Sequence, residues 1–256
     1  MSIQERFSRK NRWVEGNEIN RTARIRLFCL PYAGGGTSIF RSWSKELPSF
    51  VDVCPIQLPG RETRLDEPAA VRMEPLADAM TRAILPYLDK PFAFFGHSMG
   101  ALINYEVARR LRAGNGLEPV HLFASAHGGP HIPEQDRHVY RLSDAEFLNH
   151  LRTLNGTPQQ VLDCPQLMEI LLPTLKADFE LLGTYEYTPA APFRCPITVF
   201  GGSHDESVTA DQLAGWENHT TGKVSVRFLP GDHFYLLSHK SLLLRMISEE
   251  LHRAGR

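Results

Sequence analysis

A serine between two glycines is the first candidate for chemistry in this chain. Residues 96–100 read GHSMG, which is the pattern G-x-S-x-G. In this pattern the serine lies on a sharp turn between a strand and a helix and presents its hydroxyl for nucleophilic attack. The apolar run at 92–95 predicts the strand, and the helical pattern at 101–111 predicts the helix. The alternative is a serine that caps a helix in an ordinary glycine turn.

The glycines have a physical role if Ser98 is a nucleophile. A turn from strand to helix over one residue forces Ser98 into a strained conformation. A Cβ at Gly96 or Gly100 would then clash with the neighbouring strand or helix. The positive N-terminal end of the following helix also favours negative charge that develops at the site.

A serine hydroxyl needs a base, and in hydrolases with this turn the order along the chain is serine, acid, histidine. Residues 231–234 read GDHF and follow a predicted strand, so they lie at the same sheet edge as the serine. His233 is therefore the predicted base among eleven histidines. His239, in or near the next helix, is the second candidate. His97 adjoins the serine at a sharp turn, so its side chain should point elsewhere.

The acid is expected after the preceding strand. The run ITVFGG ends at Gly202, and Asp205 follows it, so Asp205 is the predicted acid. It would fix the tautomer of the histidine and stabilise the imidazolium without taking the proton. Glu206 and Asp211 remain as alternatives. Asp232 adjoins the histidine, and adjacent side chains rarely hold an imidazole in place.

An oxyanion hole needs two backbone N–H groups. One is expected from Met99, the residue after the nucleophile, and the other from a loop after an early strand. Residues 32–36, YAGGG, occupy such a loop, and Ala33 is the candidate, with Tyr32 second. The rival interpretation, a phosphate-binding loop, lacks the required lysine and glycine spacing.

These residues need a sheet that brings them to one edge. Six short apolar runs predict strands at 25–30, 51–56, 91–96, 120–126, 197–202 and 224–231. Helical patterns lie at 37–47, 73–88, 101–116 and 241–255. Short apolar strands that alternate with helices indicate an α/β fold with a mostly parallel central sheet flanked by helices.

One region interrupts the alternation, because no strand pattern occurs between 127 and 193. Ser143 and Glu146 form a capping box, and a strongly apolar helical stretch at 165–182 should kink at Pro173. We expect residues 129–190 to form a helical lid inserted in a single domain that spans 1–256. The alternative is that these helices cover one face of the sheet.

Composition excludes several classes of protein. The chain has 28 basic and 29 acidic residues and a formal net charge of −1, which argues against nucleic-acid binding. Hydrophobic residues make up 42% of the chain, enough for a buried core, but no apolar run is long enough to span a membrane. Residues 1–22 form a polar extension without the apolar segment of a secretory signal.

The four cysteines are scattered, and none forms a CxxC pair. They indicate reduced thiols in a cytoplasmic protein without a metal site. Heptads are absent, which favours a monomer.

Taken in order, several motifs resemble the type II thioesterases, stand-alone enzymes of the α/β-hydrolase fold that accompany polyketide and non-ribosomal peptide synthetases. The motifs are LFCLPYAGGG, LPGRETR, FFGHSMGA, the Asp205 loop and GDHF, and the resemblance runs from about residue 24 to the C-terminus. The animal medium-chain fatty-acyl release enzyme is a close relative of this family.

The resemblance implies hydrolysis of acyl thioesters on the phosphopantetheine arm of an acyl or peptidyl carrier protein, for editing or release, without a cofactor. It implies that Ser98, Asp205 and His233 form the triad and that Ala33 and Met99 form the oxyanion hole. The helices at about 129–190 would cover the acyl chamber as a lid.

Apolar residues of the predicted lid are candidates for contact with the acyl chain. They are Leu171, Leu172, Leu175 and Phe179, to which Tyr32 of the early loop is added. Packing within the lid itself is the alternative for each. Arg61 and Arg64 could meet the pantetheine phosphate, but pairing with neighbours such as Glu62, Asp66 or Glu67 is the favoured interpretation.

Three functions remain after the sequence is read. The favoured one is a carrier-protein thioesterase. The second is a hydrolase of medium-chain fatty-acyl thioesters or of oxygen esters on the same fold. The third is a binding module without catalysis, against which the intact set of serine, acid and histidine argues.

Overall fold

The structure is a computed structural model of the 256-residue chain. It describes residues 11–14, 20, 22–135, 137–154, 156 and 159–254. Most of the predicted polar extension, namely 1–10, 15–19 and 21, therefore lies outside the described residues, as do 136, 155, 157 and 158 within the predicted lid.

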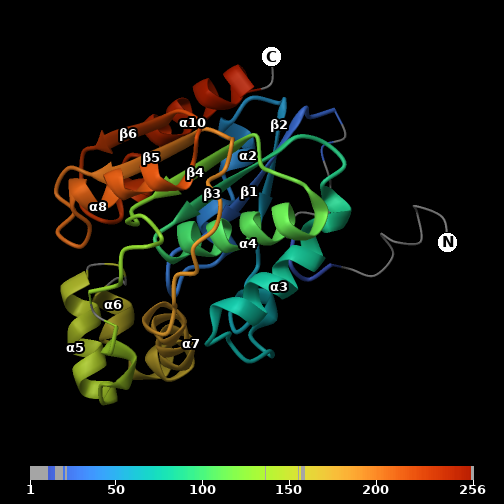
Figure 1. Ribbon diagram of the computed structural model, residues 1–256. Coiled ribbons are helices and arrows are strands. Elements are labelled where there is room, and N and C mark those ends of the chain that lie inside the picture. The colour runs from blue at the N-terminus through green and yellow to red at the C-terminus, as the bar shows by residue number, and fades with distance from the viewer. Residues whose placement is uncertain are drawn as a thin grey trace.

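Six parallel strands form one sheet in the order β2-β1-β3-β4-β5-β6 (Figure 1). Their bounds are β1 Ile25–Leu30, β2 Val51–Pro55, β3 Phe92–His97, β4 His121–Ser125, β5 Ile197–Gly202 and β6 Val224–Leu229. Each lies within about two residues of a predicted strand, so the α/β fold with a parallel sheet is confirmed. Because all strands run the same way, the loops after them meet at one edge of the sheet.

Helices cover both faces of this sheet (Figure 1). The long helices are α3 Met73–Ile84, α4 Met99–Asn115 and α10 Lys240–Ala254, and the short helix α2 is Trp43–Glu46. Residues of α3 and α4 pack with Phe28 and Leu30 of β1, whereas residues of α2 and α10 pack with Leu27 and Cys29 on the other face. Successive β1 side chains thus enter two separate cores, which explains why its sequence is apolar throughout.

Shorter helices lie in the connections between these elements. They are the 3-10 helices η1 Thr37–Phe40, η2 Glu62–Arg64, η3 Leu85–Tyr87 and η5 Gly215–His219, and the α-helices α8 Ala210–Ala214 and α9 Tyr235–Ser238. None of the helices in the described ranges is long and apolar enough to cross a membrane.

The predicted insertion contains helices and no strand in its described residues. They are η4 Val139–Arg141, α5 Asp144–Leu154, α6 Gln159–Leu162 and α7 Pro165–Gly183. We call α5, α6 and α7 the inserted helices. They lie at the lower left of Figure 1 and have their own apolar cluster, and Leu181 of α7 also joins the cluster of α3 and α4. The predicted capping box begins α5, where the Ser143 N–H donates to Glu146 Oε2 at 3.0 Å.

Two predicted helices are shorter than the sequence suggested. The stretch 37–47 divides into η1 and α2, and Phe40 and Trp43, spaced by three, pack edge to face in the core at 4.9 Å. That spacing suits the 3-10 turn, in which positions three apart eclipse. The stretch 73–88 is α-helical only to Ile84, because Pro86 lacks the N–H that would continue the helix.

The described residues near the N-terminus pack against the body of the protein. Val14 is buried and forms an antiparallel bridge with Ile56, next to the last residue of β2. The guanidinium of Arg64 lies over the ring of Trp13, 4.1 Å from its centroid. Val14 therefore adds one isolated bridge next to the edge strand, a role that the polar composition of 1–22 did not predict.

Candidate active site

Ser98 lies at the junction of β3 and α4 with a strained backbone. Its φ is 53° and its ψ is −121°, a conformation that L-residues rarely adopt. Its side chain makes no hydrogen bond to the start of α4, so Ser98 does not cap this helix with its side chain, which was the alternative interpretation. The Ser98 N–H instead donates to the carbonyl of Ser125 at 2.7 Å, which holds the turn against the end of β4.

The two glycines of the motif leave space for this turn. A Cβ at Gly96 would lie 2.2 Å from the carbonyl oxygen of Gly100. A Cβ at Gly100 would lie 2.5 Å from the carbonyl oxygen of Leu30, at the end of β1. Both contacts are backbone contacts that cannot move aside, so the predicted reason for the glycines is confirmed.

Asp205 and His233 are brought together by the loops after β5 and β6. The Nδ1 atom of His233 lies 2.8 Å from Oδ2 of Asp205, whose side chain is 1% exposed. The other carboxylate oxygen accepts the Ser207 N–H at 2.8 Å. Because a carboxylate only accepts hydrogen bonds, Nδ1 of His233 carries a proton, and Nε2 of a neutral ring is free to accept one.

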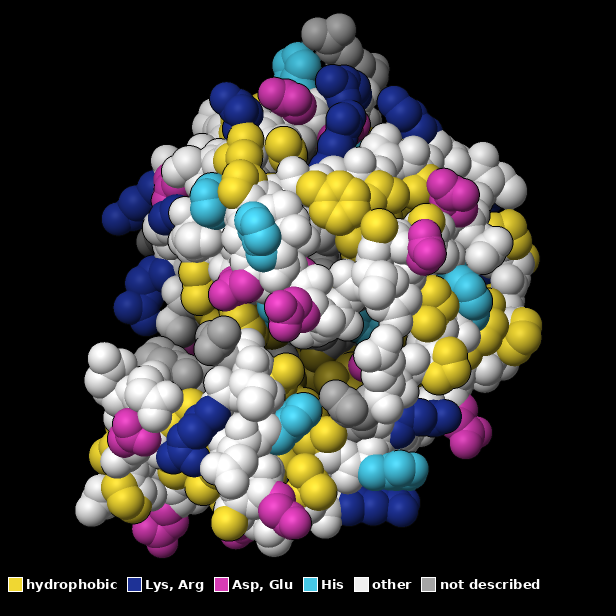
Figure 2. Space-filling model, turned by 90° about the vertical axis from the view of Figure 1, so that its left-hand side faces the viewer, with side chains coloured by type: hydrophobic (Ala, Val, Ile, Leu, Met, Phe, Trp, Pro, Cys, Tyr) yellow, Lys and Arg dark blue, Asp and Glu magenta, His cyan; other side chains and the backbone are white. Residues whose placement is uncertain are grey.

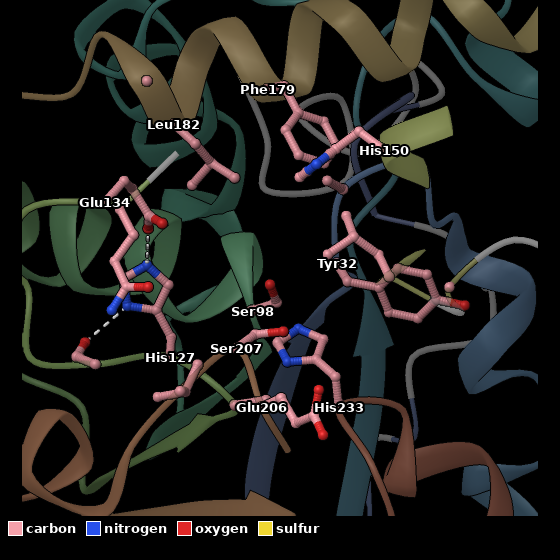
Figure 3. Close-up of a pocket in the computed structure, with 18 of the residues that line it drawn as sticks. Tyr32, Ser98, His127, Glu134, His150, Phe179, Leu182, Glu206, Ser207 and His233 are labelled. Atoms are coloured by element: carbon pink, nitrogen blue, oxygen red, sulfur yellow. Dashed lines mark hydrogen bonds and ion pairs between the residues drawn. The ribbon is translucent and has the colours of Figure 1, made fainter. Parts of the chain in front are cut away.

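Ser98 and His233 line the same cavity (Figure 3). The cavity has a volume of about 400 Å³ and is bounded by the strand ends on one side and by the inserted helices on the other. Figure 2 shows a hollow in the middle of one molecular face with hydrophobic side chains inside it. A concave site of this size with a few convergent polar groups suits a small ligand or an acyl group.

The alternative candidates for base and acid are placed less suitably. His239 pairs with the neighbouring Ser238 hydroxyl, and Asp232 is exposed and accepts the N–H of Phe234. Glu206 lines the cavity but is exposed and makes no hydrogen bond to a histidine among the described residues, and Asp211 is exposed in α8. Of the four acids considered, only Asp205 contacts an imidazole among the described residues.

The predicted oxyanion loop follows β1. Ala33 lines the cavity beside Ser98, and Met99 is the first residue of α4. Within the described chain, neither backbone N–H donates a hydrogen bond, whereas the next one in the loop, that of Gly34, donates to Oδ2 of Asp178 at 2.7 Å. Two N–H groups without acceptors next to a nucleophile are what an oxyanion hole requires.

A buried ion pair fixes the oxyanion loop to an inserted helix. Arg61 contacts both carboxylate oxygens of Asp178 on α7, at 2.6 and 2.7 Å, and its guanidinium also donates to the Gly35 carbonyl at 3.2 Å. Both side chains of the pair are at least 93% buried. The expected pairing with sequence neighbours is wrong for Arg61 and confirmed for Arg64, which pairs with Glu67.

We expect Asp178→Asn to lower the free energy of unfolding by about 3–5 kcal/mol, because it leaves the buried Arg61 charge unpaired. It should also lower kcat, because the new amide NH₂ faces the Arg61 guanidinium and displaces the side chain that accepts the Gly34 N–H beside Ala33. The matched control is Glu180→Gln, which breaks the exposed Arg72–Glu180 pair on the same helix and should cost less than about 1 kcal/mol. Denaturant unfolding measures both, and equal losses would contradict the prediction.

His97 points into the protein interior and connects the site to a buried polar chain. Its Nε2 lies 2.9 Å from the His233 carbonyl, and its Nδ1 lies 2.9 Å from the Ser125 hydroxyl. That hydroxyl is 2.5 Å from the phenol of Tyr235. Burial and the nearby charge of His233 lower the pKa of His97 well below its usual value. Neutral His97 therefore donates from Nε2, accepts at Nδ1 and holds the backbone of His233.

Removal of this contact should impair catalysis more than stability. We expect His97→Leu to lower kcat about 100-fold, because a misplacement near 1 Å has an effect of that size. His97→Gln offers an amide N–H near the position of Nε2 and should recover most of the loss. His121→Leu removes another buried histidine, bonded to Thr198 at the opposite end of β4, and is the stability control. Equal kcat in His97→Leu and His121→Leu would refute the positioning role.

The inserted helices form part of the cavity wall. Leu175 and Phe179 of α7 line the cavity, together with Tyr32 from the oxyanion loop. Leu171 and Leu172 are not among the residues that line it, and they pack with Leu175 and Phe179 in the cluster of the inserted helices, which is the alternative that the sequence left open. Leu171 lies one helical turn before Leu175, nearer the start of α7.

An interacting pair of cavity residues, His127 and Glu134, is among those that the sequence analysis missed. His127 follows β4, and Glu134 lies seven residues later. Asp205 and His233 were predicted because they follow strands of a parallel sheet and so lie at one edge of it. His127 follows β4 at the same edge, so the same rule would have found it. Nothing in the sequence marks Glu134, since it lies in an irregular segment.

Comparison with known proteins agrees with this geometry. The family described as thioesterase domain matches residues 25–251. Gramicidin S biosynthesis protein GrsT of Aneurinibacillus migulanus is 45% identical over 247 residues, which is 96% of each chain. The medium-chain S-acyl fatty acid synthase thioesterase of Anas platyrhynchos is 38% identical over 89% of this chain and 92% of its own.

Among solved structures, RedJ, a thioesterase from the prodiginine pathway of Streptomyces coelicolor, superposes with a TM-score of 0.85 at 39% identity. The likeness covers 90% of this chain and 87% of RedJ. The chain therefore belongs to the thioesterase family and is a type II thioesterase, an enzyme of the α/β-hydrolase fold that hydrolyses thioesters.

Proposed function

We propose that Ser98 is the nucleophile, His233 the general base and Asp205 the residue that orients it. One observation carries the proposal: the serine occupies a strained strand-to-helix turn in the same cavity as a histidine whose Nδ1 lies 2.8 Å from a buried carboxylate. That arrangement leaves Nε2 of the ring as the atom that takes the serine proton.

The reaction then needs only side chains, backbone and water. Ser98 attacks the thioester carbonyl while His233 takes its proton, and the N–H groups of Ala33 and Met99 stabilise the oxyanion. The thiolate leaves readily, because a simple thiol has a pKa of about 8.5, and it takes the proton from His233, which is then neutral again. Water activated by His233 then hydrolyses the acyl-serine, and no metal or cofactor takes part.

The substrate proposed is an acyl group on the phosphopantetheine arm of an acyl or peptidyl carrier protein. The names of two relatives support it, since GrsT belongs to gramicidin S biosynthesis and RedJ to a prodiginine pathway. Tyr32, Leu175 and Phe179 would contact the acyl group, and the inserted helices would act as its lid within a single domain. Hydrolysis would clear or release acyl groups during polyketide or non-ribosomal peptide synthesis.

We also propose a monomer that works in the cytoplasm. The four cysteines are free, and three of them are buried, which suits a reducing compartment. Burial raises the pKa of the Cys195 thiol to about 12, so this cysteine is unreactive.

A medium-chain fatty-acyl thioesterase is the second candidate. The similarity to the Anas platyrhynchos enzyme supports it, as does the apolar side of the cavity. That side consists of Leu151, Leu154, Leu175, Phe179 and Leu182.

The test is a panel in which each acyl group is presented as a carrier-protein thioester, a coenzyme A thioester and an oxygen ester. We expect the highest kcat/KM for the carrier thioester, and a fluorophosphonate probe should label Ser98. Higher kcat/KM for the oxygen esters would reject the thioesterase proposal. A steady rise from four to twelve acyl carbons on coenzyme A, without a preference for the carrier, would favour the second candidate.

A further inference from the structure

An ion pair lies in the wall of the cavity and has no role in the mechanism above. Nε2 of His127 is 2.9 Å from Oε1 of Glu134, and Nδ1 of His127 is 2.7 Å from the carbonyl oxygen of Gly128. Figure 3 shows this pair on one side of the cavity and Tyr32 and His150 on the other, with Ser98 between them.

The pair consists of an imidazolium and a carboxylate. Both partners of the His127 ring are acceptors, so both ring nitrogens must donate and the ring is protonated. Burial is the largest single influence and lowers the pKa of His127, but the hydrogen bond to Glu134, the charge of Glu134 and the bond to the Gly128 carbonyl together outweigh it, and the net shift is upward. Burial likewise raises the pKa of Glu134, but the bond to His127 and the charges of His127 and His233 lower it overall.

One carboxylate oxygen of Glu134 is left without a partner. The bond to His127 uses Oε1, and Oε2 accepts no hydrogen bond within the described chain. The His127 side chain is 9% exposed, whereas that of Glu134 is 36% exposed and lines the cavity. His127 thus fixes the carboxylate, and its second oxygen remains open to a ligand.

Acidic side chains are present in the cavity wall, and lysine and arginine side chains are not among its described lining residues. The two carboxylates are those of Glu134 and Glu206. A substrate cation would meet the open oxygen of Glu134 there, whereas the imidazolium of His127 already uses both ring N–H groups on Glu134 and Gly128 and offers no donor to a substrate carboxylate. The opposite side, with Phe179 and Leu182, offers contact to the aliphatic part of the same acyl group.

We propose that Glu134, oriented by His127, is a subsite for the ammonium group of an amino-substituted acyl chain whose thioester carbonyl lies at Ser98. The inference rests on the proposed function, because the acyl group must enter this cavity to reach the subsite. A charge-assisted hydrogen bond between ammonium and carboxylate is roughly twice as strong as a neutral one, which makes the subsite selective.

The pair also connects the end of β4 to the segment that carries Glu134, so a purely structural role must be distinguished. A structural role predicts that loss of the carboxylate changes the hydrolysis of all acyl groups by a similar factor. A binding role predicts that the change depends on whether the acyl group carries an amine.

The experiment compares matched pantetheine thioesters at pH 7. Alanyl is paired with isobutyryl, and 4-aminobutyryl with pentanoyl, so that each pair differs only by an ammonium in place of a methyl group. The quantity measured is the ratio of kcat/KM for the amino member to that for the neutral member. Comparison of this ratio between proteins cancels the intrinsic reactivity of each thioester.

We expect Glu134→Gln to lower the ratio at least 10-fold in one or both pairs. The control Glu206→Gln removes the other carboxylate of the cavity and should change the ratio less than 3-fold. If Glu134→Gln does not fold, Glu134→Asp, which moves the carboxylate back by one methylene, serves the same comparison and should lower the ratio at least 3-fold.

The outcomes separate this inference from the proposed function. Ratios that agree within 3-fold between wild type and the Glu134 variant overturn the subsite but leave thioester hydrolysis intact. Hydrolysis of no member of either pair by the wild-type enzyme, either on pantetheine or on a carrier protein, overturns the proposed function and the subsite with it. A fall in the ratio for Glu206→Gln as large as for Glu134→Gln assigns the effect to the general charge of the cavity and also overturns the subsite.

Discussion

Ser98→Ala is expected to lower kcat for thioester hydrolysis by about 10⁶-fold, the size of effect seen when the nucleophile of a serine hydrolase is removed. The reason is that Ser98 carries the only hydroxyl of GHSMG, so its loss removes the nucleophile from the strained turn between β3 and α4. Stability should change little, because alanine retains the Cβ and therefore the strain of the positive φ.

Ser98→Gly should lose activity equally but gain stability. Glycine adopts the φ of 53° without strain, and an L-residue held in such a region costs about 1–3 kcal/mol. The larger entropy of the unfolded glycine chain offsets part of this gain. A net stabilisation of about 1 kcal/mol should remain, which corresponds to a rise of about 2–4 °C in Tm.

The chain offers a matched control at the end of the neighbouring strand. Ala126, directly after β4, has a φ of 52° and contributes no reactive side chain. Ala126→Gly should therefore raise Tm by a similar amount while it keeps most of the activity. If Ser98→Gly is less stable than Ser98→Ala in thermal unfolding, the turn is not strained and the stability argument fails.

The elements and the order of the site residues were predictable because they depend on local signals. Each strand is apolar throughout, since both faces of the sheet are covered, and each helix carries an apolar stripe. Once the strands are parallel, topology alone places the loops that contain Ser98, Asp205 and His233 at one edge. The glycines could also be explained in advance, because the sharp turn at Ser98 leaves no space for a Cβ at Gly96 or Gly100.

Contacts between distant segments were not predictable. Arg61 pairs with Asp178, which is 117 residues away, and the sequence offered three closer carboxylates as equally good partners. Leu171 and Leu175 are one helical turn apart and equally apolar, yet only Leu175 of the two lines the cavity. The sequence pattern cannot separate them. Glu134 lies in an irregular segment, where no periodicity indicates which way a side chain points.

Asp205→Asn is expected to lower kcat by about 10⁴-fold through the tautomer of His233. Oδ1 of Asp205 accepts the Ser207 N–H, and an asparagine would keep its oxygen at that position. The amide NH₂ then faces Nδ1 of His233, which must become the acceptor. The proton moves to Nε2, and the ring cannot take the proton of Ser98.

The effect should appear in kcat alone. The carboxylate of Asp205 is 1% exposed and both of its oxygens are occupied, so it cannot contact the substrate, and KM should remain within about threefold. Asp232→Asn, an exposed carboxylate next to His233, is the control and should retain nearly full kcat. If Asp205→Asn retained activity while Glu206→Gln or Asp211→Asn lost it, the acid would be one of those residues. The 2.8 Å contact between Asp205 and His233 would then be structural only.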